Sequence, residues 1–289
     1  MIKVSKRFTD RAKGSLRRYQ RVLESARARD VGESDTVVIV SDFLSDVLGY
    51  DKYEDVTTEF AVRSTFCDLA VKRGGRVQFL IEVKSVGTDL RENHLRQAVD
   101  YAANQGVEWV LLTNGAAWRA HRVRFEQPIA HDQVFALDLL DPDAKPQALL
   151  ERLYLVSKEA GGEQEIDRYW RQKEATSRYL IAQILLDPTT LSVVRRQLRT
   201  LFPGLKVGEE TLAELLRTEV LKRDVLEGDK ATAAARLVRR GARKRAVAAG
   251  PKTPADGVPV VDDRAGAGNG SVDAPLALSQ GALADGPSA

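Results

Sequence analysis

The pattern of apolar and polar positions predicts a mixed first half of the chain and a helical second half. Apolar residues spaced three and four apart predict helices over residues 10–30 and 33–49. Three short apolar runs then predict strands at 56–62, 66–72 and 77–84. The sequence RGGR separates the last two runs, and glycines between two strands favour a hairpin.

A crossover helix follows the third predicted strand. Helical spacing over residues 88–104 predicts this helix, opened by Thr88 or Asp89. A crossover of this kind leads to a strand parallel to the preceding one, here VEWVLLTN at 107–114. The predicted sheet is therefore mixed.

Two further strands complete the predicted sheet. The Asn-Gly pair after the parallel strand predicts a hairpin into residues 116–123. Residues 133–140 can add an edge strand before Pro142. We therefore predict an α/β fold, with a mixed sheet flanked by helices, that ends near residue 140.

The second half of the chain has a different pattern. Helical periodicity runs from Pro146 to about Arg245, and Pro188, Pro203 and Gly228 interrupt it. The chain then becomes rich in Gly, Ala, Pro, Ser and Asp without aromatic residues, which is typical of disorder. We expect a basic helical arm (1–30), an α/β domain (31–140), an all-α domain (146–247) and a disordered tail (248–289).

Positive charge is concentrated in two places along the chain. The net charge of +3 over 289 residues is too small to indicate a nucleic-acid partner by itself. Residues 1–30, however, carry ten Lys and Arg residues against three acidic ones, and a second basic run covers 235–245. Two interpretations stay open for these runs: solvated helix faces, or contacts with nucleic-acid phosphates. For the first helix we favour a solvated amphipathic arm.

The rare residues restrict the chemistry. The only cysteine, Cys67, excludes an intramolecular disulfide, and with three histidines it offers no Cys/His zinc cluster. No apolar run approaches the roughly 18 residues that a membrane span needs. We therefore expect a cytoplasmic protein without a membrane partner.

Charged residues interrupt the third predicted strand. In FLIEVKSVG, residues 79–87, Glu82 and Lys84 lie two apart and therefore on one face. Charges in a buried strand are costly unless they are paired or bound to a metal. Asp68 lies on the strand that pairs with this one, so the three side chains can meet at one end of the sheet. Two carboxylates suit Mg²⁺ or Mn²⁺, and an ammonium beside them suits hydrolysis of a phosphodiester.

This arrangement resembles the active site of the PD-(D/E)xK nuclease superfamily, which has the restriction-endonuclease-like fold. Asp68, Glu82 and Lys84 match its order of two acids and a lysine. Gln97 and Tyr101 match the QxxxY element of one branch, and their spacing puts them on one helix face. The stretch WVLLTNGAAWRAHRV resembles the N-terminal domain of type I restriction enzyme R proteins.

The resemblance, which covers roughly residues 30–125, implies a function for each matching position. It implies a Mg²⁺-dependent or Mn²⁺-dependent DNA endonuclease of the restriction type, with a role in prokaryotic defence. The extra acid that this branch places on the first core helix is either Glu33 or Asp35. The implied roles are metal ligation by Glu33, Asp68, Glu82 and the carbonyl of Val83, catalysis by Lys84, and positioning of nucleic-acid backbone or of the lysine by Gln97 and Tyr101.

The chain departs from the family pattern in two ways. Cys67 precedes Asp68, so the nominal proline of the motif is missing. These residues also contain no G-x-x-x-x-G-K-[ST] phosphate loop and hence no ATPase motor of the kind that type I R proteins carry. A restriction role therefore needs another source of target selection. The helical part can serve specificity, homo-oligomer formation or docking of a partner protein.

Two other functions fit the same residues. The chain can be an accessory protein that keeps the nuclease fold and binds nucleic acid or a partner with little or no hydrolysis. Alternatively, the triplet is structural, with Glu82 and Lys84 as an ion pair on the open face of an edge strand. Because unpaired acids crowded beside a lysine destabilise a sheet, retention of all these residues favours the nuclease.

Overall fold

The computed structural model describes residues 2–62, 65–161 and 163–248. Internal contacts divide the chain into two units, Met1–Arg240 and Gly241–Ala289. From residue 249 on, the predicted tail lies outside the described residues. The division into four parts with the boundaries given above stays a prediction.

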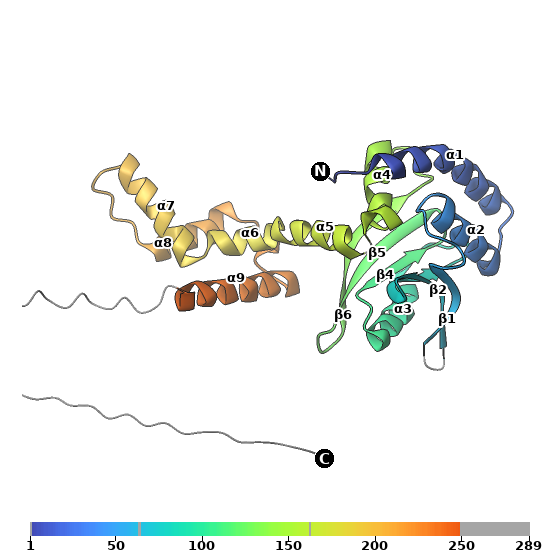
Figure 1. Cartoon of the computed structure of the whole chain (residues 1–289). Coiled ribbons are helices and arrows are strands. Elements are labelled where there is room, and N and C mark those ends of the chain that lie inside the picture. The colour runs from blue at the N-terminus through green and yellow to red at the C-terminus, as the bar shows by residue number, and fades with distance from the viewer. Residues whose placement is uncertain (1, 63–64, 162, 249–289) are drawn as a thin grey trace, which may run out of the picture. The chain divides into compact units, whose positions relative to one another are not determined.

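The first part of the chain forms a six-stranded mixed sheet with helices around it (Figure 1). The strands follow one another in sequence order across the sheet, and every neighbouring pair is antiparallel except β3 and β4. This confirms the predicted hairpins and the parallel strand after the crossover. The strands are β1 Val56–Val62, β2 Thr65–Arg73, β3 Arg76–Val83, β4 Trp109–Thr113, β5 Ala117–Arg124 and β6 Ala130–Asp138.

The crossover helix α3, Glu92–Gln105, begins later than predicted. Thr88 does not cap the helix, because its amide and its hydroxyl both bond to Ser85. The amide donates to the Ser85 carbonyl at 2.9 Å, and the Thr88 and Ser85 hydroxyl oxygens are 2.6 Å apart. Residues 85–88 therefore form a turn of their own. The extended residue Arg91 precedes the helix instead.

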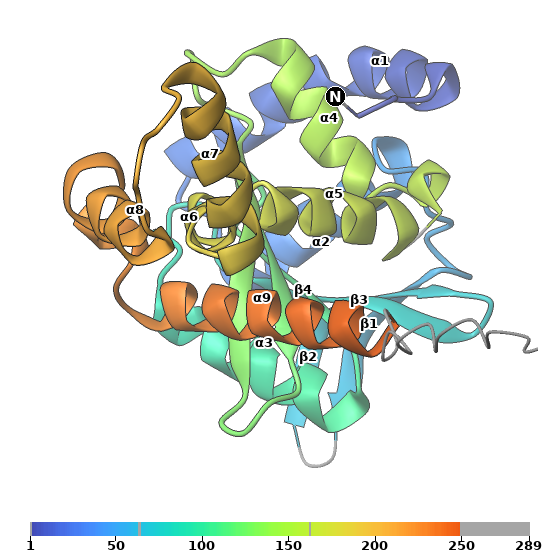
Figure 2. The ribbon, with the colours of Figure 1, turned by 90° about the vertical axis from the view of Figure 1, so that its left-hand side faces the viewer.

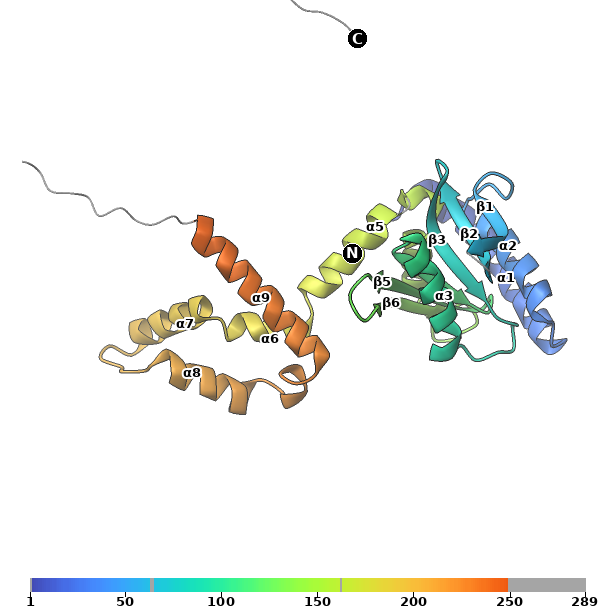
Figure 3. The same cartoon turned by 90° about the horizontal axis from the view of Figure 1, so that it is seen from below.

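Helices cover both faces of the sheet. Helices α1 (Lys6–Ala28), α2 (Glu33–Asp46) and α4 (Pro146–Leu155) contribute to one apolar cluster, and α3 contributes to the other. Figure 3 shows α3 on the opposite side of the sheet from α1 and α2. Because side chains alternate along a strand, Ile81 of β3 faces the first cluster and Leu80 the second. Strand β3 is therefore buried on both faces.

Helix α1 is not a solvated arm, which corrects the interpretation favoured from the sequence. Five of its residues are buried in the core: Phe8, Ala12, Tyr19, Leu23 and Ala26. Its arginines are exposed except Arg11, which bonds to the carbonyl of Val47, so a basic composition and a packed helix are compatible.

Gly115 shows how closely α1 approaches the sheet. It has φ +85°, and a Cβ there would lie 2.7 Å from Leu23 Cδ2 of α1. The predicted Asn-Gly turn therefore meets two requirements at once, a left-handed backbone and a close helix contact.

The later part of the chain is helical, as predicted. Its helices are α5 Glu163–Ala175, α6 Arg178–Leu185, α7 Pro188–Leu201, α8 Glu209–Leu215 and α9 Asp229–Ala248. Two short 3-10 helices, η1 Lys158–Ala160 and η3 Arg223–Val225, and a π-helix, η2 Leu216–Val220, accompany them. Figure 2 shows helices α7 and α8 next to each other, and a small apolar cluster joins them. No described helix is long and apolar enough to cross a membrane.

Candidate active site

Four charged side chains from three elements meet at one end of the sheet. Asp68 lies in β2, Glu82 lies near the end of β3, and Lys84 follows β3 directly. Glu33 is the first residue of α2. The pairing of β2 with β3 thus brings the two predicted acids together, and α2 supplies a third acid.

The end of the β2–β3 ladder gives Asp68 its position. The last ladder pair at this end is Leu69 with Ile81, after which the strands separate. The amide of Lys84 donates to the carbonyl of Thr113 on β4 at 2.8 Å. The amide of Val83 points the other way and donates to Asp68 Oδ2 at 2.7 Å. The Asp68 carboxylate therefore replaces a backbone acceptor at the point where the strands separate.

Lys84 lies between two carboxylates. Its Nζ is 2.8 Å from Glu82 Oε1 and 3.3 Å from Glu33 Oε2. The Glu82 side chain is 4% exposed and the Glu33 side chain 48% exposed, so the pair with Glu82 is the buried one. Glu33, rather than the exposed Asp35, is the acid of α2 that contacts the lysine.

The environment of Glu82 disfavours its charged form. Its Oε2 is buried and has no hydrogen-bond partner among the described residues. Burial and the nearby Asp68 raise the pKa of Glu82 to about 7, although the hydrogen bond from Lys84 opposes this shift. A positive charge next to Oε2 would relieve this strain.

The other two groups titrate under the same influences. Burial raises the pKa of Asp68, against the opposing effects of the Val83 amide and Lys84, and Glu33 adds to the increase. Burial lowers the pKa of Lys84, but Glu82 and the two other acids outweigh it, so that the pKa is raised. The lysine therefore stays an ammonium ion at neutral pH.

The residues present fit a hard divalent cation held by two carboxylates. The unpartnered Glu82 Oε2 and the partly buried Asp68 are oxygen donors, which Mg²⁺ and Mn²⁺ prefer. No group of three or more His, Cys, Asp or Glu residues in the described part of the chain is arranged to hold a metal ion. Mg²⁺ is commonly held by one or two carboxylates together with waters and substrate phosphates. Glu33 bonds to Lys84 here, so its role as a ligand stays a prediction.

Gln97 and Tyr101 lie one turn apart on α3 and contact each other. Gln97 Nε2 donates to the Tyr101 hydroxyl, whose ring is buried. Within residues 2–62, 65–161 and 163–248, no hydrogen bond or ion pair joins either residue to Glu82 or Lys84. The structure therefore forms the QxxxY pair without linking it to the acids.

The alternative of an ion pair on an edge strand is correct about the pair but not about the strand. Glu82 and Lys84 do pair, but β3 lies between β2 and β4 and is not an edge. Because the pair lies largely buried at the end of a central strand, an exposed structural salt bridge does not account for it.

Two residues that support the site escaped the sequence analysis. Thr113 accepts the Lys84 amide through its carbonyl, and Asn114 Nδ2 donates to the carbonyl of Thr88 at 2.9 Å. Both side chains are buried. They fix the segment that follows β3, and the Asn-Gly pair that marks this turn in the sequence was the available signal.

The comparisons with known proteins support the resemblance found in the sequence. Residues 39–132 match the family described as type I restriction enzyme R protein N terminus. This segment includes Asp68, Glu82, Lys84, Gln97 and Tyr101 but not Glu33. Neither the curated proteins nor the solved structures gave a match. Residues 39–132 are therefore similar to the N terminus of type I restriction enzyme R proteins, as the sequence motifs indicated.

Proposed function

We propose that this protein is a metal-dependent phosphodiester hydrolase that acts on DNA, an endonuclease of the restriction or defence type. One observation carries the proposal: the buried Glu82, with an unpartnered Oε2, lies beside Asp68 and is bonded to Lys84. A fold gains nothing from such crowding, whereas a cation site for phosphodiester hydrolysis needs it. The family match over residues 39–132 supports the same function.

Asp68 and Glu82 would hold the cation, with the Val83 carbonyl beside them and Glu33 at the exposed side. When bound, Mg²⁺ or Mn²⁺ supplies positive charge for the phosphate oxygens and an acidified water. Glu82 would then turn from a strained carboxylate into a paired one. Cation binding and DNA cleavage should therefore depend on the same two acids.

Lys84 would act on the phosphate or on the attacking water. Its backbone is fixed by Thr113 and its ammonium by two acids, so the charged end needs little reorganisation. Once a cation neutralises Glu82, the Nζ can turn a hydrogen bond toward a phosphate oxygen. Gln97 and Tyr101 would position nucleic-acid backbone next to it.

One observation favours a second function, an accessory protein that binds DNA without cutting it. The ammonium of Lys84 already satisfies one oxygen each of Glu82 and Glu33. If these bonds to Lys84 persist in the presence of Mg²⁺, Glu82 and Glu33 do not bind the cation. A cleavage assay separates the two functions.

The decisive experiment measures nicking and linearisation of supercoiled DNA with Mg²⁺, with Mn²⁺ and with EDTA. Wild type should cut only with metal, and Glu82→Gln or Lys84→Met should reduce the rate by a factor on the order of a hundred or more. The matched control is Asp35→Asn, which changes an exposed acid of α2 that does not pair with Lys84. It should cut like wild type.

Each outcome has a clear meaning. Equal cleavage by wild type and both site variants contradicts the nuclease proposal. Binding of DNA by a wild type that never cuts, with either metal, establishes the accessory function instead. Thermal unfolding of each variant shows whether a lost activity reflects the site or the fold.

A further inference from the structure

Helix α7 has an apolar face and a basic face. Leu191, Val194 and Leu198 are spaced three and four apart and pack in a cluster with Leu212 of α8. Asp187 caps the start of the helix, because its Oδ1 accepts a hydrogen bond from the Thr189 amide at 3.0 Å. The apolar face is therefore used within the helical part of the chain, which leaves the basic side chains to face solvent.

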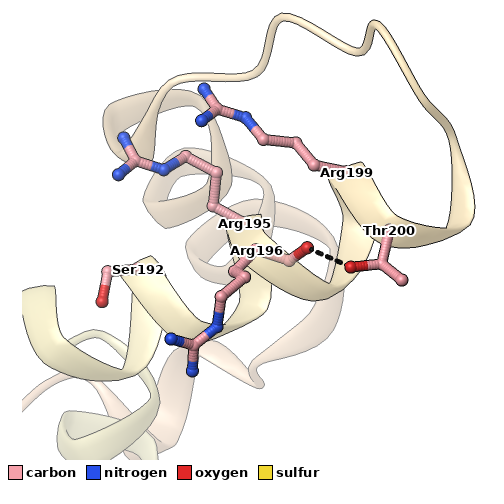
Figure 4. Close-up of a pocket in the computed structure, with 5 residues that line it drawn as sticks. All are labelled: Ser192, Arg195, Arg196, Arg199 and Thr200. Carbon is pink, nitrogen blue, oxygen red and sulfur yellow. Dashed lines mark hydrogen bonds between the residues drawn. The ribbon is translucent and has the colours of Figure 1, made fainter.

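Three arginines of α7 line a surface pocket of about 500 Å³. In Figure 4 the side chains of Arg195 and Arg199 point to one side of α7 and that of Arg196 points to another, and Ser192 and Thr200 complete the lining. We call these three arginines the α7 arginine surface. Its residues lie outside the segment that matches the restriction enzyme family.

The charge of this surface is mostly uncompensated. Helix α7 contains no acidic residue. Arg195 pairs with Glu209 of α8 at 3.1 Å. Arg196 and Arg199 are exposed, and no ion pair to either is found in the described part of the chain. Each guanidinium offers five N–H donors and no acceptor, so the matching ligand is an anion rich in oxygen.

We propose that the α7 arginine surface binds the phosphate backbone of duplex DNA. From Arg195 to Arg199 the helix rises by about 6 Å. A single strand of a duplex presents a phosphate about every 3.4 Å along its axis. The rise from Arg195 to Arg199 therefore covers about two phosphate spacings, with Arg196 on the adjoining side of the helix, and each guanidinium can form paired hydrogen bonds with phosphate oxygens.

This assignment gives the chain a means of holding DNA that is separate from the candidate active site. Backbone contacts of this kind carry no sequence information, so the surface increases affinity for any duplex. The inference rests on the proposed function, because its ligand is the proposed substrate. It uses none of the site residues, however, and DNA binding requires no metal.

The test measures binding of a short blunt duplex to the full chain by fluorescence anisotropy in EDTA. Salt is varied from about 50 to 200 mM, because phosphate contacts make affinity depend on salt. Arg196→Ala/Arg199→Ala should weaken binding about tenfold or more at the lowest salt and reduce the log–log salt slope by about two. Arg196→Lys/Arg199→Lys keeps the charge and should retain most of the slope.

A matched control removes two arginines elsewhere. Arg17 and Arg21 of α1 are exposed and have no ion pair in the residues that the structure describes. Arg17→Ala/Arg21→Ala changes the net charge equally and should leave affinity and slope near wild type. An equal loss in this control, or no loss in the α7 double variant, overturns the proposal.

Two further arms complete the test. Saturable binding of inorganic phosphate that the α7 double variant abolishes, while duplex binding persists, overturns the proposal in favour of a small-anion site. Duplex binding that depends on α7 in a protein that never cuts DNA supports this inference and contradicts the proposed function. If the protein cuts DNA at the candidate active site but the α7 double variant binds DNA like wild type, the proposed function is supported and this inference is contradicted.

Discussion

At the scale of single residues, Glu82 and Lys84 form an ion pair whose attraction offsets the free-energy cost of burying both charges. Removing one partner from a buried ion pair typically costs about 3–5 kcal/mol, because the other charge stays buried. Lys84 has a second partner in Glu33. Glu82 is 3% exposed, and its Oε2 has no hydrogen-bond partner in the described residues. Substitution of Lys84 therefore affects the fold through Glu82, which is why stability has to be measured beside activity.

His121 gives a pH prediction. Both ring nitrogens are buried without a hydrogen-bond partner in the described residues. Burial, with His131 and Arg119 nearby, lowers the pKa of His121 from 6.5 to about 4. Between these values the unfolded chain binds a proton that the folded chain does not. The free energy of unfolding should therefore fall as the pH decreases through this window, by up to about 3 kcal/mol at 1.36 kcal/mol per pKa unit.

His121→Leu tests this prediction. The apolar side chain removes the titration and leaves no buried polar group unpaired, so stability near pH 7 should change little. Urea unfolding at several pH values from 7 to 4.5 should give a flatter dependence for the variant than for wild type. Parallel curves would show that other groups cause the loss of stability in acid.

The sequence was sufficient for the residues that local pairing brings together, and insufficient for those that depend on distant packing. Asp68 and Glu82 lie on strands joined by the RGGR turn, so their proximity follows from one hairpin. The Lys84–Glu33 contact joins residues that are far apart in the chain, and it depends on how α2 packs on the sheet. Spacing favoured Glu33 but left Asp35 as an alternative for that reason.

At the scale of elements, α1 belongs to the core of the α/β domain. Phe8 is fully buried, and its ring lies 5.4 Å from that of Tyr154 of α4 in an edge arrangement. Arg11 forms two hydrogen bonds with the Glu159 carboxylate of η1. These partners are about 150 residues away in the chain, so the stripe of apolar residues on α1 gave no sign of what it would contact.

Phe8→Ala should therefore destabilise the protein strongly. Replacing a buried Phe by Ala leaves a cavity and typically costs about 3–5 kcal/mol. Val22→Ala is the matched control on the same helix, because Val22 is 37% exposed, and it should cost less than about 1 kcal/mol. Urea unfolding measures both. Similar small effects for the two variants would restore the interpretation of α1 as a solvated arm.

At the scale of the whole molecule, Arg122 connects the sheet to the helices that follow it. Its Cζ lies 4.1 Å from the ring centre of Trp170 on α5 and 5.7 Å from that of Trp109 on β4. The same guanidinium is 2.7 Å from Glu108 and 3.5 Å from Asp167. One side chain of β5 thus contacts both a neighbouring strand and α5. The sequence could not reveal this contact, because each of these residues has an ordinary surface or core interpretation alone.

Arg122→Met should loosen α5 without disturbing the candidate active site. The variant keeps an apolar stem but loses both cation–π contacts and both ion pairs. Of these, the contacts with Trp170 and Asp167 hold α5, and together they are worth about 1–2 kcal/mol. Because 1.4 kcal/mol is a factor of ten in an equilibrium, amide hydrogen exchange in Glu163–Ala175 should become about tenfold faster, with β2 and β3 unchanged.

Arg124→Met is the control for this prediction. Arg124 lies two residues further along β5 and forms its ion pairs with Glu126 and Asp132. Toward α5 it has, among the described residues, only a longer-range attraction to Glu174. Exchange in α5 should therefore match wild type in that variant. If both variants leave α5 unchanged, another contact holds the helix, and Lys173, which donates to the carbonyl of Val134 at 2.7 Å, is then the residue that joins it to the sheet.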